Sequence, residues 1–369
     1  MSTVLSSDDI KRRLTSLDFM RGFIMCLLAL ESTGLYDTLY ESSIGGPLEN
    51  IFIQFQHHPW NGLRFWDLIQ PGFMFIAGTA MAFSLQSQAN KGIAKSATTV
   101  KMLKRSGWLF FWGVLLYAVR KTGLSFELWN VLTQLSFTLL ISYLIYEWAT
   151  KYHIIFCVGL LLLTELLYRF THVSGFDQPF TNQQNFGNYI DMLLMHKTSK
   201  GGWVAINCIP TAVHTIAGAL VGKWIMGEHT KKEKLIFLIG AVLIVVGYTM
   251  DFTHITPIIK RIATSSFTIV SLGWCMVFFA ICYYVMDVKK GRELLFFKVL
   301  SMNSIFIYLL FETVGTKWLN GYMTQLVSGL LQLISFPTTA TSILCSLSIF
   351  AVEWGICLFL YRKKIFFRL

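Results

Sequence analysis

Charged residues are scarce in this 369-residue chain. They make up 14% of it, whereas 54% of the residues are hydrophobic, and the mean hydropathy is +0.56. A soluble domain usually carries about a quarter charged residues, so the composition excludes an ordinary soluble protein. The apolar residues come in blocks of about 17–25, the length that crosses a bilayer core of roughly 30 Å. We therefore predict an all-α fold, a polytopic transmembrane bundle of about ten helices.

Other common features are missing as well. The seven cysteines form no Cys-x-x-Cys pair and all lie in apolar blocks, which predicts packing side chains and neither disulfides nor metal ligands. The first 18 residues lack an apolar segment, so no cleavable signal peptide is expected. We find no internal repeat, no low-complexity segment and no room for a separate soluble domain. These absences predict one membrane domain over residues 1–369.

The basic residues predict the orientation of the chain in the membrane. A net charge of +11 does not indicate nucleic-acid binding here, because the lysines and arginines lie in short runs between apolar blocks. With the N-terminus in the cytoplasm, 21 of the 31 fall in inner segments and nine in outer ones. Basic residues favour the cytoplasmic side, so both termini are expected there, in a multi-pass protein of the plasma (inner) membrane. Membrane lipids are expected partners, and a monomer and a homodimer both stay open. The ten expected spans are 16–36, 65–86, 106–119, 128–148, 153–168, 203–226, 235–250, 266–286, 294–316 and 340–361.

Polar side chains gather between the first two expected spans. His57 and His58 lie just ahead of an apolar run, and Trp60 and Trp66 are typical of the aromatic belt at a membrane surface. Asp67 is expected just inside that belt. A neutral imidazole at this depth can take or give a proton near neutral pH. The alternative is a loop whose histidines are only hydrated.

Ionisable groups inside a bilayer are costly, so each is a functional candidate. Asp18 and Arg21 lie three residues apart at the inner end of the first span, on one helical face, where they can neutralise each other. Arg13 and Arg21 also suit a phosphate-bearing ligand. The sequence leaves a structural ion pair and an anion site both open.

Polar residues also lie within later spans. His214 is either a packed, hydrogen-bonded histidine or a relay group, and Gly218 and Gly222 after it have the spacing of close helix packing. Asn303, near the inner end of the ninth span, either packs polar helices or lines a cofactor tunnel. Three acids have no motif around them and receive no role: Glu165, Glu312 and Glu353.

Five segments, in this order, resemble the heparan-alpha-glucosaminide N-acetyltransferase family of transmembrane acyltransferases, including its uncharacterised bacterial members. Their order and joint presence carry the resemblance. They are Ser16-Leu17-Asp18-x-x-Arg21-Gly22, His57-x-x-Trp60-Asn61-Gly62 with Asp67-Leu68 and Pro71, Pro210 to Gly222, Pro257-x-x-Lys260-x-x-x-Thr264-Ser265-Ser266-Phe267, and Met302-Asn303-Ser304-x-x-x-Tyr308.

The resemblance implies an acetyltransferase that uses cytosolic acetyl-CoA as co-substrate and delivers the acetyl group to an amino sugar or glycan on the outer side. It implies His57 as general base or transient acetyl carrier. Asp67 is the candidate to orient it, and His58, which lacks the family's spacing to Trp60, is a further catalytic candidate. The candidate acceptor-binding residues are Glu31, Ser32, Trp60, Asn61 and Lys260. The candidate cofactor-binding residues are Arg13, Asp18, Arg21, Asn303 and Tyr308.

The chain departs from the family pattern at three positions. Ser32 stands where the family has an asparagine that partners the catalytic histidine, Ala263 replaces a tryptophan, and Ser301 replaces a glycine. Two other functions stay open. One is a proton-coupled secondary transporter whose proton path runs over Glu31, Asp67 and His214, although no repeated halves are present. The other is O-acylation of an envelope glycan.

Overall fold

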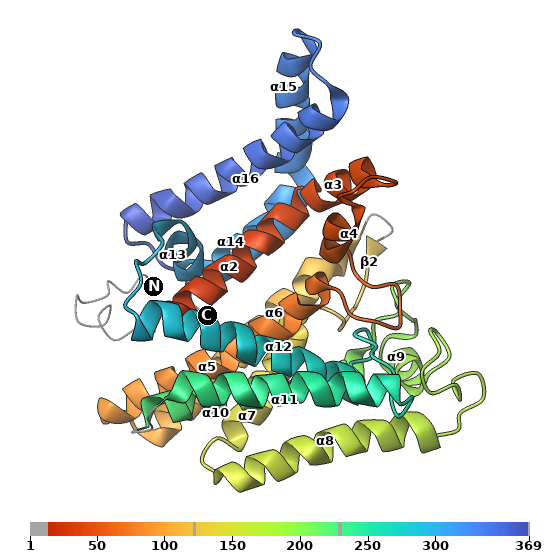
Figure 1. Ribbon diagram of the computed structural model, residues 1–369, viewed down its shortest axis with the longest axis vertical. Coiled ribbons are helices and arrows are strands. Elements are labelled where there is room, and N and C mark those ends of the chain that lie inside the picture. The colour runs from red at the N-terminus through yellow and green to blue at the C-terminus, as the bar shows by residue number, and fades with distance from the viewer. Residues whose placement is uncertain (1–13, 121–122, 228–230, 368–369) are drawn as a thin grey trace. The chain divides into compact units, whose positions relative to one another are not determined.

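The structure is a computed structural model that describes residues 14–120, 123–227 and 231–367 (Figure 1). Nearly every element in these ranges is a helix; the exception is a pair of two-residue antiparallel strands, β1 (Val119–Arg120) and β2 (Gly123–Leu124). The prediction of an all-α fold is confirmed. Arg13 lies outside the described residues.

Within the described ranges, six helices are long and apolar enough to cross a membrane, and two bent helix pairs raise the number to eight. This supports a multi-pass integral membrane protein. Two further helices, α6 (Lys95–Ala118) and α7 (Val131–Leu144), do not reach that standard, so the count of ten stays a prediction. The six helical stretches are Phe65–Asn90 (η2 and α5), Thr150–Phe170 (α8), Ala205–Met226 (η3 and α10), Lys232–Phe252 (α11), Ser265–Val288 (α12 and η4) and Thr338–Arg362 (α16).

The chain divides into two compact units. Among the described residues, the smaller one contains 14–57, 64–66 and 282–367, and the larger one contains 58–63, 67–120, 123–227 and 231–281. The histidine loop, residues 56–64 between η1 (Ile53–Phe55) and η2 (Phe65–Leu68), therefore contributes residues to both units. That the two act as one membrane domain stays a prediction.

The larger unit is organised around α5 (Ile69–Asn90) and α10 (Cys208–Met226), whose backbones touch at glycines. A Cβ atom on Gly218 would lie 2.0 Å from the carbonyl oxygen of Phe75, and one on Gly78 would lie 1.9 Å from that of Thr215. Only glycine permits such an approach. The close packing predicted at Gly218 is confirmed.

Two helices of the same unit present apolar side chains outward. Only 17% of the residues in the most apolar stretch of α8 are buried, and the share is the same for α11. In the most apolar stretch of Ala205–Met226, which contains α10, 72% of the residues are buried. Exposed apolar helix surface of this kind suits contact with lipid chains. The larger unit thus has a packed centre and an apolar rim.

The smaller unit packs α2 (Thr15–Ser32) against α13 (Leu295–Met302). A Cβ atom on Gly22 would lie 2.0 Å from the carbonyl oxygen of Phe297, so the backbones approach closely. After Ser32 the chain turns by 68° into α3 (Leu35–Ser43). Gly34 lies between the two helices with a φ of 79°, a left-handed conformation that favours glycine.

The ninth expected span, 294–316, is not one straight helix. It breaks at Asn303 by 78°, between α13 and the helices that begin at Ser304. Wider π-helical turns then follow α14, and such turns are common at functional sites. The bounds of the later elements are α14 (Ser304–Leu310), η5 (Phe311–Leu319) and α15 (Asn320–Gln332). The remaining short helices are α4 (Glu49–Phe52), η1 (Ile53–Phe55), η2 (Phe65–Leu68), α9 (Phe186–Met195), η3 (Ala205–Asn207) and η4 (Tyr284–Val288), next to α12 (Ser265–Tyr283).

Candidate active site

Asp67 is the centre of a buried polar cluster in the larger unit. Its carboxyl oxygen Oδ1 lies 3.5 Å from the ammonium nitrogen of Lys260, and its Oδ2 accepts a hydrogen bond of 3.2 Å from the backbone N–H of His58. The side chain of Asp67 is 1% exposed and that of Lys260 is 7% exposed. Asp67 therefore ties the histidine loop to the segment that precedes α12.

Backbone and aromatic contacts fix the two sides of this cluster. The N–H of Gly62 donates to the carbonyl oxygen of Ile258 at 2.8 Å, which holds the histidine loop beside the Lys260 segment. The indole N–H of Trp60 donates to the backbone carbonyl oxygen of Phe180 at 2.7 Å. The ammonium of Lys260 lies 5.4 Å from the ring centroid of Trp203, a cation–π distance.

Gly62 also sets the position of the His58 ring. Its φ is 145°, and a Cβ atom there would lie 2.5 Å from Nε2 of His58. The imidazole of His58 therefore packs directly on the backbone of Gly62. This contact gives a physical reason for the glycine in the His-x-x-Trp-Asn-Gly motif.

The charge of Asp67 reaches a further basic residue of the same segment. Burial lowers the pKa of the Arg261 guanidinium, and the negative charge of Asp67 opposes that shift. A buried carboxylate costs little only when it is paired and hydrogen-bonded, and Lys260 supplies the pairing. The structure thus places Lys260, a sequence candidate for acceptor binding, in a buried ion pair.

His57 belongs to the smaller unit and is exposed. Its carbonyl oxygen accepts a hydrogen bond of 2.9 Å from Arg64, and its ring centroid lies 6.5 Å from that of Trp66. Trp66 is only 4% exposed and packs against Tyr36 at 5.2 Å. The ring of Trp66 is thus buried among other aromatic rings, and its place in an aromatic belt at the membrane surface stays a prediction.

Asp67 was also expected to orient His57. The two residues fall in different units, and Asp67 has His58 and Lys260 as partners within its own unit. The orienting role stays a prediction. The structure shows contacts for the next residue, His58: its backbone N–H donates to Asp67, and its ring packs on Gly62.

The other candidate acceptor-binding residues differ in exposure. Glu31 and Asn61 are exposed. The hydroxyl of Ser32 donates to the carbonyl of Ala29 at 2.8 Å, one turn back on its own helix, and its own carbonyl accepts from the Asn320 amide at 2.7 Å. Ser32 thus anchors the end of α2, a role different from that of the family asparagine.

The pairing predicted at the start of the first span is confirmed. Nη1 of Arg21 lies 3.5 Å from Oδ1 of Asp18, and the hydroxyl of Ser301 donates to the same oxygen at 3.2 Å. Asp287 adds a contact that the sequence did not reveal, because its two carboxyl oxygens each accept a 3.0 Å hydrogen bond, from the N–H groups of Thr15 and Ser16. These N–H groups lie at the beginning of α2, where a helix has free donors.

Asn303 is fully buried and uses its amide within the protein. Its Nδ2 donates to the carbonyl of Ile365 at 3.2 Å, and its Oδ1 accepts from the N–H of Phe367 at 3.0 Å. Tyr308 is 6% exposed and packs its ring 5.2 Å from Phe311. The amide of Asn303 is thus hydrogen-bonded to the backbone of the segment after α16, and contact of Asn303 or Tyr308 with a cofactor stays a prediction.

His214 is likewise fully buried and hydrogen-bonded. Its Nδ1 lies 3.2 Å from the carbonyl oxygen of Thr211, and its Nε2 lies 2.9 Å from the hydroxyl of Ser271. This is the packed histidine that the sequence left as one alternative. A hydrogen bond to the neighbouring α12 explains why a polar ring is tolerated in an apolar span.

Asp191, on α9, was missed by the sequence reasoning. It is fully buried, its Oδ1 accepts from the N–H of Ala205 at 2.9 Å, and its Oδ2 accepts from the indole of Trp129 at 3.0 Å. Burial raises the pKa of Asp191 to about 7, against the effect of these two donors. Asp191 holds the segment that presents Trp203 to Lys260. The sequence signal that could have found Asp191 is a single acid inside the amphipathic segment Phe186–Met195.

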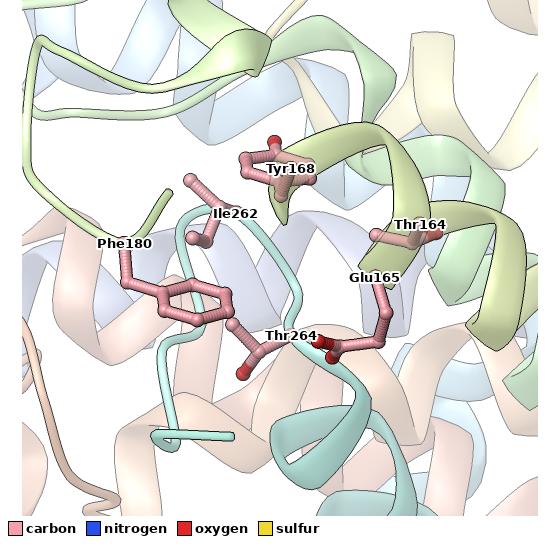
Figure 2. A pocket seen from close by; sticks show the side chains of 6 residues that line it. All are labelled: Thr164, Glu165, Tyr168, Phe180, Ile262 and Thr264. Atoms are coloured by element: carbon pink, nitrogen blue, oxygen red, sulfur yellow. The ribbon is translucent and has the colours of Figure 1, made fainter. Parts of the chain in front are cut away.

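Glu165 pairs with Arg169 at 2.9 Å, and the guanidinium lies 4.8 Å from the ring centroid of Phe180. Figure 2 shows the carboxyl of Glu165 pointing toward Thr264 in a small pocket. The pocket encloses an empty space of about 170 Å³ but is too narrow for a water molecule. We therefore exclude it as a substrate site. Its lining residues are Thr164, Glu165, Tyr168, Phe180, Ile262 and Thr264.

Metal chemistry receives no support from the described side chains. Among them, no three His, Cys, Asp or Glu residues are grouped so that they could hold a metal ion. All seven cysteines are free thiols in the structure, in buried or partly buried positions.

Comparison with known proteins adds a distant relationship. Over 104 residues the chain is 32% identical to heparan-alpha-glucosaminide N-acetyltransferase of Mus musculus and 31% identical to the protein of that name from Homo sapiens. The chain is related to this family over part of its length. The match covers 28% of the chain but only 14% of each of these relatives, and no family model matches.

Proposed function

We propose that the protein is a transmembrane acetyltransferase. It takes an acetyl group from cytosolic acetyl-CoA and delivers it to an amino sugar or glycan acceptor on the outer side of the membrane. The observation that carries the proposal is the buried Asp67–Lys260 pair, which holds the backbone of His58 and thereby fixes the loop that carries His57. The partial relationship to an N-acetyltransferase supports the reaction class.

The proposed orientation has ten spans, with both termini in the cytoplasm of a plasma (inner) membrane. It rests on the excess of basic residues in the inner segments. In this orientation His57 faces outward, and Asp18 and Arg21 lie at the cytoplasmic end of α2. The acceptor and the cofactor then approach from opposite sides.

In the proposed reaction His57 removes a proton from the acceptor nitrogen. That nitrogen attacks the thioester carbonyl carbon; the new nitrogen–carbon bond forms as the carbon–sulfur bond breaks, and the proton passes to the departing thiolate. Because the thioester is already activated, the work of the protein is placement and proton transfer. In the two-step version, His57 carries the acetyl group between the two substrates.

The other candidate residues have positioning or binding roles in this proposal. Asp67 and Lys260 neutralise each other and keep the histidine loop in place, while Trp60 and Asn61 lie on the same loop as acceptor contacts. Arg21, with Asp18 and Ser301 beside it, serves the phosphates of acetyl-CoA.

Acetyl transfer from labelled acetyl-CoA to glucosamine, measured in detergent, tests which histidine reacts. We expect His57→Ala to lose about 10²–10⁴-fold in rate, the usual contribution of a general base. His58→Ala should lose less, because its ring packs on Gly62. Thermal stabilisation by acetyl-CoA shows that each variant is folded and binds the co-substrate. An inactive His58→Ala beside an active His57→Ala would reverse the assignment, and full activity in both would remove it.

The cofactor end is tested separately by Arg21→Ala. We expect weaker thermal stabilisation by acetyl-CoA and unchanged binding of the sugar, because the cationic phosphate contact is lost. N-acetylglucosamine, whose amine is blocked, serves as the acceptor control and distinguishes N- from O-acylation. Unchanged acetyl-CoA affinity in a folded Arg21→Ala protein would leave Arg21 as the structural partner of Asp18.

A further inference from the structure

The larger unit contains a second, much roomier pocket at the far end of α5. It has a volume of about 430 Å³ and lies where α5 and α7 end and α6 begins. The 22 residues of α5 extend about 33 Å at 1.5 Å per residue, so this pocket and Asp67 lie at opposite ends of the same membrane-length helix. The pocket is separate from the candidate active site.

One wall of the pocket is polar and carries a replaceable cation. The ammonium of Lys95 lies 2.5 Å from the carboxyl of Glu147, and their side chains are 72% and 68% exposed. Exposed ion pairs contribute little to stability, so Lys95 can exchange Glu147 for another anion. Next to this pair, the hydroxyls of Thr99 and Tyr143 lie 2.7 Å apart and offer further hydrogen-bonding groups.

The pocket lining also includes apolar side chains that are open to the surroundings. Leu144 is 68% exposed, Trp148 is 46% exposed and Ile93 is 42% exposed, and all three line the pocket. The Trp148 ring is held by an edge contact with Phe156, 5.8 Å between centroids. A cation beside exposed apolar and aromatic side chains at a helix end matches the boundary between lipid headgroups and acyl chains.

Outside the pocket lining, α6 exposes further apolar side chains. Four large ones are between 48% and 51% exposed. A soluble nucleotide has no group that would cover them, whereas an acyl chain does. They are Val100, Leu103, Trp108 and Phe111.

We propose that this pocket binds an anionic phospholipid. The lipid phosphate pairs with Lys95 in place of Glu147, the hydroxyls of Thr99 and Tyr143 contact the headgroup, and an acyl chain covers Leu144 and Trp148. The proposal does not depend on acetyl transfer, since it uses none of the residues assigned to that reaction.

Two substitutions of opposite effect test the site. In nanodiscs that contain phosphatidylglycerol and phosphatidylcholine, native mass spectrometry measures how much phosphatidylglycerol stays bound to the protein. We expect Lys95→Gln to retain about tenfold less, because the phosphate loses its cation. Glu147→Gln should retain several-fold more, because the competing carboxylate is gone. Lys101→Gln is the matched control, an exposed lysine of the same helix outside the pocket lining.

Equal losses in Lys95→Gln and Lys101→Gln would overturn the proposal, since a general charge effect would then explain lipid binding. Equal retention of phosphatidylcholine and phosphatidylglycerol by the wild-type protein would overturn it too. Displacement of phosphatidylglycerol by free acetyl-CoA in the wild-type protein, but not in Lys95→Gln, would assign the pocket to the soluble co-substrate. All three variants change exposed side chains, so their folding is checked by unchanged melting temperatures in phosphatidylcholine alone.

Discussion

Asp67 and Glu353 are both buried acids, one in each unit, and their surroundings differ. Asp67 has an ammonium group at 3.5 Å and a backbone N–H at 3.2 Å. Glu353, on α16, is fully buried, and neither of its carboxyl oxygens has a hydrogen-bond partner among the described residues. A Cβ atom on Gly315 would lie 3.0 Å from Oε1 of Glu353 and 3.6 Å from Oδ1 of Asn320, itself an acceptor without a partner there.

The difference separates two uses of a buried carboxyl group. With a cation and a donor, the charged form is stable and can hold a loop in place, as at Asp67. Where no hydrogen-bond donor among the described residues partners a buried carboxylate, as at Glu353, the charged form is costly. Breaking the first arrangement and neutralising the second should therefore have opposite effects on stability.

The largest effect is expected from Lys260→Met, which leaves the carboxylate of Asp67 buried without its cation. Loss of one partner of a buried ion pair costs about 3–5 kcal/mol. Thermal unfolding in detergent measures the change. The double variant Asp67→Asn, Lys260→Met should recover part of the loss, because no uncompensated charge remains. A single Lys260→Met variant as stable as the wild type would mean that the pair is not important for the fold.

Asp191 provides a pH-dependent test of the same region. Its pKa in the folded protein is raised to about 7, from an ordinary value of 3.8, because it is buried. Between those pH values the folded state keeps a proton that the unfolded state has lost, so stability falls as pH rises from about 4 to 7, by at most about 1.4 kcal/mol per pH unit. Asp191→Asn should flatten that part of the melting-temperature profile. A profile with the same slope in the variant would assign the pH dependence to other groups.

The smallest effect is expected from Glu353→Gln, and it has the opposite sign to that of Lys260→Met. The amide keeps the shape of the side chain, carries no charge and replaces one acceptor that lacks a partner with a donor. We expect a gain of about 1–3 kcal/mol, the cost of leaving a buried polar group unsatisfied. Denaturant titration of the wild-type protein and the Glu353→Gln variant measures this gain. Glu312→Gln, at another acid of the same unit, is the comparison variant. A clear destabilisation by Glu353→Gln would show that the charged form has a partner that stabilises it.

Much of the fold could be predicted because apolar blocks of spanning length leave a strong signal in the sequence. The bends could not. Gly34 ends α2 through a left-handed conformation, yet most glycines in apolar spans serve packing instead, as Gly218 does. The break at Asn303 depends on hydrogen bonds to residues 365 and 367, more than sixty positions away.

Residues of the candidate site could be predicted from the sequence, but the contacts between them could not. Asp67 and Lys260 both stood out, but they are almost two hundred residues apart in the sequence, and only the fold brings them together. The buried position of Trp66 was missed because a tryptophan near a span end fits an interface and a core equally well. Asp191 had no motif, since its partners are a backbone N–H and a tryptophan from other segments.

The contact between Gly62 and His58 has an evolutionary consequence. Two independent constraints act on position 62: its φ of 145° disfavours any side chain, and the imidazole of His58 occupies the space of a Cβ atom. A smaller residue at position 58 would relieve the second constraint and leave the first. No single substitution at position 62 is therefore neutral, whatever its chemistry. We therefore expect substitutions in this loop at its other positions, with the backbone conformation at position 62 retained.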